Sequence, residues 1–258
     1  MFGIAELTFR KIKEPSFLIM LVFAVLLGAV VSDISSLAEQ MSGSILEQLI
    51  NRPTGCHLFT STLFAFAITA LLAIFAGSTD IPRDIDSGMV MLLLSKPVGK
   101  AGYLMGKYLG ILALCTLFFT VAEASIVVGH WLMTGEWHQF KAVVRQFYML
   151  FALLPMVAIT VMFSCFLSDL SSMIVTAVYM FLSLSVSAVP LLVAVLPKSL
   201  GVNIYLYMFY FFFPNVLYYF QTMDLFGVTA LSMAVYSVSM SAIFLCIGVL
   251  RLNQRDFV

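Results

Sequence analysis

The residues with the most distinctive spacing in the chain are Asp84, Asp86 and Gly88. They follow a Ser-Thr-Asp sequence at residues 78–80, which offers N-cap side chains, and Pro82, which suits the first turn of a helix. Carboxylates in a first turn interact favourably with the helix dipole. The pattern predicts a short helix that begins near residue 78 with an acidic start. Such a helix is suited to docking into a partner protein and not to catalysis.

An apolar stretch continues this segment from Met89 to Leu94 and is too short to cross a membrane. Ser95 to Pro97 interrupts it, and Gly99 to Gly106 leads into the next apolar run. We therefore assign residues 78–97 to a coupling region. The residues predicted to contact the partner are Asp84, Asp86, Gly88, Leu92, Leu93 and Pro97.

Glu123 is the one acidic residue well inside an apolar run. A carboxylate in the middle of a bilayer costs a few kcal/mol on insertion scales, so its side chain should face protein, water or a substrate path. Two interpretations stay open. Either Glu123 is an intramembrane gate or relay, or the membrane span ends earlier and Glu123 lies near the external interface.

Catalytic and metal-binding motifs are missing from the sequence. The nearest match to a phosphate-binding loop, Gly102 to Tyr108, has three residues between its glycines instead of four and lacks the hydroxyl that holds magnesium. No HExxH or GxSxG sequence occurs. The three histidines, His57, His130 and His138, lack the spacing of metal ligands, and the four cysteines form no CxxC pair. We expect no enzymatic activity, metal site or cofactor on this chain.

Hydrophobic residues make up 62% of the 258 residues and charged residues only 10%. Average soluble domains have about 45–50% apolar and about 25% charged residues, so a water-soluble globule is excluded. Thirteen Lys and Arg residues balance thirteen Asp and Glu residues. The chain therefore has no basic excess with which to bind nucleic acid.

The apolar residues are gathered in long runs. A hydrocarbon core of about 30 Å needs about 20 mostly apolar residues in a helix. Six runs qualify, near residues 16–32, 58–77, 106–128, 147–167, 171–196 and 226–250. They are continuous rather than alternating, which favours helices over membrane strands. The sequence predicts an all-α polytopic membrane protein with six transmembrane helices in one transmembrane domain, residues 1–258.

The ends of these runs give an orientation. Residues 1–14 place Phe2, Ala5, Phe9 and Ile12 at helical spacing, which predicts an N-terminal amphipathic elbow helix in the membrane interface. Across six spans, nine Lys and Arg residues fall on the side of the N-terminus and four on the other side. The excess of positive charge predicts that both termini are cytoplasmic.

An aromatic segment precedes the last run. Ten of the seventeen residues from Ile204 to Phe220 are aromatic, and Pro214-Asn215 interrupts them. Tyr and Phe suit a membrane interface. We expect residues 200–224 to form a re-entrant or interfacial external segment in which Phe213, Pro214 and Asn215 line an exit, and a lipid-facing aromatic belt is the alternative.

The block from Asp84 to Lys107 resembles the signature of type 2 ABC exporter permeases, with an acidic-x-acidic-x-Gly sequence, an LLS-x-P sequence and a GK pair. More particularly, it is similar to the branch that includes the permease for nitrous-oxide reductase maturation. Phe213-Pro214-Asn215 and the ending from Arg251 to Phe257 are also similar to that branch. Ile85 and Met89 depart from its usual basic residue and Thr.

The resemblance implies a six-helix permease half that pairs with a second half and with two cytoplasmic ATPase subunits, which would hold ATP and Mg. It further implies an exporter in a bacterial cytoplasmic (inner) membrane, with an external or periplasmic partner left open. Nothing in the chain duplicates residues 84–107, so the second half must come from another chain, most simply a second copy. Two other functions stay open. One is a proton-driven secondary transporter that uses Glu123, and the other is a membrane anchor that passes ATPase motion to an external partner without transport.

Overall fold

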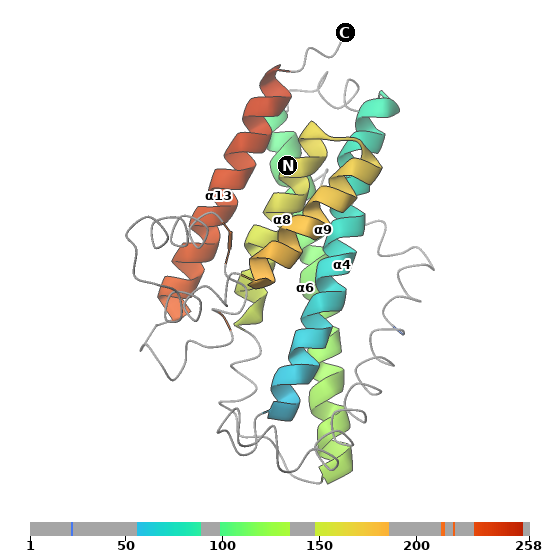
Figure 1. The fold of residues 1–258 in the computed structure, drawn as a ribbon, viewed down its shortest axis with the longest axis vertical. Helices are drawn as coiled ribbons and strands as arrows, with labels where there is room; N and C mark the ends of the chain where they lie inside the picture. Colours follow the sequence, from blue (N-terminus) through green and yellow to red (C-terminus); the bar gives the residue numbers. More distant parts are fainter. Residues whose placement is uncertain are drawn as a thin grey trace, which may run out of the picture.

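The computed structural model describes residues 22, 56–88, 99–134, 148–185, 213–214, 219 and 230–254. Within these residues every regular element is an α-helix. The helices are α4 (Cys56–Asp86), α6 (Lys100–Thr134), α8 (Met149–Phe166), α9 (Asp169–Ser185) and α13 (Ala230–Gln254), and they form a bundle (Figure 1). The prediction of an all-helical chain is confirmed for this part of the sequence.

Helix α8 is the core of the bundle and packs against each of the other four described helices. Apolar residues on different sides of it, including Leu153, Val157 and Ile159, are fully buried. A helix that is hydrophobic all round belongs in an interior. Helices α4 and α6 run antiparallel beside each other and extend beyond the other helices at the lower end of Figure 1.

Four of the described helices are long and apolar enough to cross a membrane, over Ser61–Asp86, Lys100–Gly129, Met149–Phe166 and Leu231–Gln254. They fall on the runs predicted near residues 58–77, 106–128, 147–167 and 226–250. The shorter apolar helix α9 covers the first part of the run predicted near residues 171–196. The elbow at residues 1–14 and, apart from the helical Val22, the run at residues 16–32 lie outside the described residues. The chain is a polytopic helical membrane protein, and the number of six spans stays a prediction.

One local prediction is wrong: no new helix begins near residue 78. Helix α4 continues without a break through residues 78–80 and Pro82 to Asp86. The hydroxyl of Thr79 donates to the Phe75 carbonyl of its own helix at 2.9 Å, so it does not cap a helix start. Proline inside a membrane helix is tolerated where neighbouring groups satisfy the freed backbone. The N-cap signal was misleading because Thr79 bonds within α4 and Asp80 pairs with Lys107 on α6.

The acidic residues of this segment consequently lie at the end of α4, where the helix dipole disfavours negative charge. The helix ends at Asp86, and the turn after it contains Gly88, whose φ of 69° is left-handed and favours glycine. The Ser87 N–H donates to the Arg83 carbonyl at 2.9 Å and the Gly88 N–H to the Ile85 carbonyl at 3.1 Å, which satisfies two of the last carbonyls. The turn at Gly88 therefore ends α4.

Helices α4 and α8 approach each other closely at Gly77. A Cβ atom on this residue would lie 2.6 Å from Cγ2 of Thr160, whose hydroxyl is held by the Met156 carbonyl at 2.9 Å. We expect Gly77→Ala to lower the free energy of unfolding in detergent by about 1–3 kcal/mol, because a packed interior cannot absorb the added methyl group. Thermal unfolding measures the loss. Gly99→Ala, where nothing lies within 4 Å, is the control, and Gly77→Ala/Thr160→Ser should regain most of the stability. An unchanged melting temperature for Gly77→Ala would contradict this packing.

Candidate functional site

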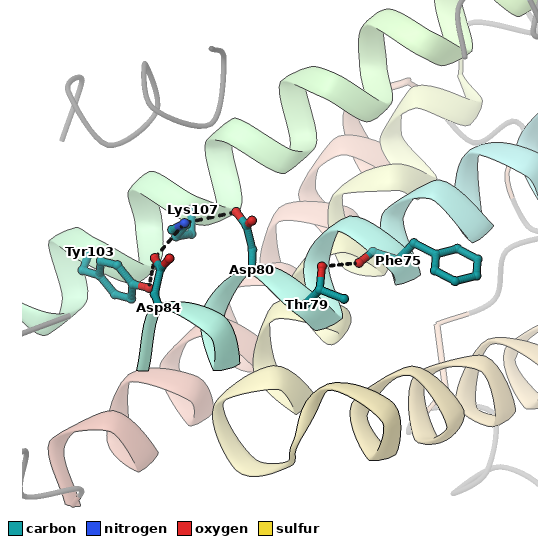
Figure 2. Close-up of polar contacts among 6 residues, drawn as sticks. All are labelled: Phe75, Thr79, Asp80, Asp84, Tyr103 and Lys107. Carbon is teal, nitrogen blue, oxygen red and sulfur yellow. Dashed lines mark hydrogen bonds and ion pairs between the residues drawn. The ribbon is translucent and has the colours of Figure 1, made fainter. Parts of the chain in front are cut away.

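A cluster of charged side chains joins α4 to α6 next to the connection between them (Figure 2). The ammonium nitrogen Nζ of Lys107 lies 3.1 Å from Asp80 Oδ2 and 2.8 Å from Asp84 Oδ2. The hydroxyl of Tyr103 donates to Asp84 Oδ2 at 2.8 Å. Asp80 and Asp84 are four residues apart on α4, and Tyr103 and Lys107 are four residues apart on α6. Residues with this spacing lie on one face of a helix. We call these four residues the charged cluster.

The charged cluster is largely shielded from solvent. The side chains of Lys107, Asp80 and Asp84 are 10%, 7% and 15% exposed, respectively. Removing one partner of a buried ion pair costs about 3–5 kcal/mol, because the other charge is left buried and unpaired. Two carboxylates face one ammonium group, so the cluster carries one net negative charge, and the Tyr103 hydroxyl adds a donor. The cluster therefore joins α4 to α6 through contacts in which the loss of one charged partner is costly.

Further polar contacts gather at the same end of the bundle. The ammonium group of Lys100, at the start of α6, donates to the carbonyls of Leu252 and Asn253 at 3.0 and 3.5 Å, which stabilises the end of α13. Arg83 Nε lies 3.8 Å from Asp169 Oδ2 at the start of α9, an exposed and therefore weak pair. We call this end, at the top of Figure 1, the charged end of the bundle.

Glu123 lies toward the opposite end of α6. Sixteen residues separate it from Lys107, which is about 24 Å along a helix. The side chain is 1% exposed and lies against α4, where Thr62 Oγ1 donates to Glu123 Oε2 at 3.4 Å. Glu123 Oε1 has no hydrogen-bond partner among the described residues. Since α6 continues as a helix to Thr134, Glu123 is a buried interhelical residue and does not mark the end of a helix.

The described part of the aromatic segment is packed into the bundle. The Phe213 ring lies 4.6 Å from the Tyr179 ring of α9, and the Ser183 hydroxyl of α9 donates to the Pro214 carbonyl. Tyr219 is buried and shares a hydrogen bond with Ser237 of α13. These residues are therefore not part of a lipid-facing belt, and Asn215 lies outside the described residues.

The predicted coupling residues separate into three groups. The carboxylate of Asp84 is turned toward α6, while Asp86 is exposed at the end of α4. Gly88 lies in the turn that ends that helix. Leu92, Leu93 and Pro97 lie outside the described residues.

Sequence reasoning missed the roles of Asp80, Tyr103 and Lys107. It interpreted Asp80 as a helix cap. It counted Lys107 among the positive charges that predict the topology and as part of the GK pair. One signal in the sequence could have revealed the cluster. Asp80 and Asp84, and likewise Tyr103 and Lys107, are four residues apart, and the two helices that carry them flank a short connection. Within the described helices no three His, Cys, Asp or Glu side chains gather as a metal site would require, and the expectation of no metal remains a prediction.

A bundle of long apolar helices with a charged end defines an integral membrane protein of the polytopic helical class. A family model described as ABC-2 family transporter protein matches residues 4–257, so the chain belongs to this family. The family supplies the membrane-embedded permease subunit of ABC transporters, a component that is not itself an ATPase. The match does not single out the nitrous-oxide reductase maturation branch. None of the curated proteins matches the chain.

Proposed function

We propose that this chain is the permease subunit of an ATP-driven exporter that moves a substrate, or does work, at the outer face of a bacterial inner membrane. Separate cytoplasmic subunits would bind ATP and Mg and hydrolyse the ATP, and the chain itself would hold no cofactor. One observation carries the proposal. The helices on either side of the connection at residues 87–99 are joined directly beside it by the buried charged cluster, so force applied to the connection would reach both membrane helices.

The contact with the ATPase falls on the connection. Asp86 and Ser87 are exposed where α4 ends, and Leu92, Leu93 and Pro97 follow in the coupling region. Leucine side chains on a short segment can fill a groove of a partner, with a carboxylate at the rim that favours the correct orientation. Asp84 supports this contact from within the permease.

The charged end of the bundle would face the cytoplasm. All four described Lys and Arg residues lie there: Arg83, Lys100, Lys107 and Arg251. Cytoplasmic ends of membrane helices carry an excess of positive residues. With an even number of spans, both termini would be cytoplasmic as well.

Two permease halves would form the working unit, because each half offers one coupling region and two ATPase subunits need two. A homodimer is the simplest arrangement, since the chain contains a single copy of residues 84–107. The exposed faces of the helices, for example Phe64 and Phe75 on α4, would meet lipid or the second half. An external partner would bind at the end opposite the charged end.

The test is the composition of the complex. We expect the tagged chain, purified from its native membranes in mild detergent, to retain an ATPase whose activity orthovanadate inhibits. The mass of the complex should correspond to two permeases and two ATPase subunits. Absence of an ATPase would contradict the proposed function. One permease per complex would contradict the two-half arrangement, and two different permease chains would contradict only the homodimer.

A further inference from the structure

The α4–α6 pair is held by polar contacts near both of its ends, and the two differ in kind. At the charged end, the ammonium group of Lys107 lies 3.1 Å from Asp80 and 2.8 Å from Asp84. About 24 Å away along α6, α4 and α6 are joined by the 3.4 Å hydrogen bond from Thr62 to Glu123. The second carboxyl oxygen of Glu123 has no partner among the described residues.

The two contacts differ in the cost of separating their partners, because separation at the charged cluster leaves buried charges unpaired. A buried charged network loses about 3–5 kcal/mol when it is broken at one partner. Hydrogen bonds between side chains of membrane helices average about 0.6 kcal/mol, and a 3.4 Å contact lies at the long end of the range. The pair therefore separates more readily at the Thr62–Glu123 contact than at the charged cluster.

The surroundings of the two contacts also differ. One turn from the Thr62–Glu123 contact, on the side of the charged cluster, Phe66 and Phe119 form an edge-to-face pair with ring centroids 6.3 Å apart. Toward the far end, α4 and α6 extend beyond the other described helices (Figure 1), and Trp131 and Leu132 of α6 are exposed. A tilt of about 10° about the charged cluster moves a point 24 Å away by about 4 Å, enough to expose a buried side chain.

We propose that Asp80, Asp84 and Lys107 are positioning residues that keep the charged ends of α4 and α6 together during the ATPase cycle, so that the pair opens at Glu123. This inference rests on the proposed function. It adds which contact between α4 and α6 stays closed during the cycle and which contact opens. The charged cluster fixes the pivot, and the weak Thr62–Glu123 contact is the gate. Lys100 joins the start of α6 to α13, which gives the pivot a further support.

The experiment measures access to a buried position near the gate. Ile126, 1% exposed and three residues beyond Glu123, is replaced by Cys in a chain carrying Cys56→Ala and Cys246→Ala. The native Cys115 and Cys165, both fully buried, remain as sealed controls. A water-soluble maleimide is applied to the complex with its ATPase, first without nucleotide and then trapped with ATP and orthovanadate, and mass spectrometry gives the modified fraction at each cysteine.

We expect trapping to raise the modification rate at position 126 about tenfold and to leave Cys115 unmodified. In Asp80→Asn/Lys107→Met, which keeps the net charge of the cluster and leaves Asp84 in place, the rise should disappear while the ATPase is retained. Lys107→Arg should preserve the rise. Tyr108→Phe is the matched control, because it removes a 3.3 Å hydrogen bond from α6 to the Leu154 carbonyl of α8 instead.

Two results would overturn the inference while leaving the proposed function intact. One is an unreactive position 126 in the trapped parent complex, and the other is an undiminished rise in Asp80→Asn/Lys107→Met. If the parent chain retains no ATPase, the proposed function fails and the inference fails with it. Each variant is confirmed to be folded by its elution volume and by the continued protection of Cys165 from the maleimide.

Discussion

Replacing Lys107 with Met is expected to lower the free energy of unfolding by about 3–5 kcal/mol, the largest loss for any single side chain of the charged cluster. The substitution keeps the length and apolar stem of the side chain but removes the ammonium group that contacts both Asp80 and Asp84. Two carboxylates, 7% and 15% exposed in the parent chain, would then lie on one face of α4 without the cation that pairs them with α6. Unfolding by a denaturing detergent, followed by circular dichroism, measures the loss.

Two controls separate lost charge pairing from lost packing. Asp80→Asn/Lys107→Met should regain part of the stability, because it removes one of the two carboxylates left without a cation, while Asp84 keeps the Tyr103 hydroxyl as its partner. Lys100→Met, which removes a part-buried lysine from the carbonyls at the end of α13, should cost no more than about 1 kcal/mol. If Lys107→Met unfolds at the same detergent concentration as the parent chain, the charged cluster does not bind α4 to α6.

The spans were predictable because the bilayer imposes a length. About 20 apolar residues are needed to cross it, and the four described spans fall on four of the predicted runs. The bilayer constrains each helix separately, so a span can be predicted without knowing which helices pack against it. The family could also be inferred, because the block from Asp84 to Lys107 and the chain ending are sequence motifs.

The charged cluster was not predictable in the same way. Ser78, Thr79 and Asp80 followed by Pro82 form a good local signal for a helix start, yet α4 continues past all of them. The partner that overrides the local signal, Lys107, lies 27 residues from Asp80 in sequence. Cap preferences are local, whereas this contact depends on how α4 and α6 are aligned.

Glu123 illustrates the same limit. The sequence places a carboxylate in an apolar run but does not give its depth, because α6 has 35 residues, about 52 Å, and is longer than a bilayer core is thick. The structure shows that the Glu123 side chain faces protein and not water, because it is buried and lies beside Thr62. Whether Glu123 acts as a gate is the question that the labelling experiment addresses.

The second large effect is expected at the coupling region. Leu92→Ala/Leu93→Ala should weaken binding of the ATPase about 100-fold, because truncating two anchor side chains in a docking groove costs more than 1 kcal/mol each. Asp86→Lys should add a smaller, salt-dependent loss, since Asp86 is exposed and would lie at the rim of the proposed contact. Retention of the ATPase on the immobilised permease, measured against ATPase concentration, gives both values.

Asp84 is left unchanged in this test, since its carboxylate binds Lys107 and its replacement would disturb the charged cluster as well as the coupling region. Leu170→Ala is the matched control. Leu170 is 69% exposed on the second residue of α9 and so offers a leucine at the same end of the bundle but outside the coupling region. The leucine variants should insert into the membrane normally, because residues 89–94 are too short to form a span. Full retention of the ATPase by Leu92→Ala/Leu93→Ala, or an equal loss in Leu170→Ala, would show that the ATPase binds elsewhere.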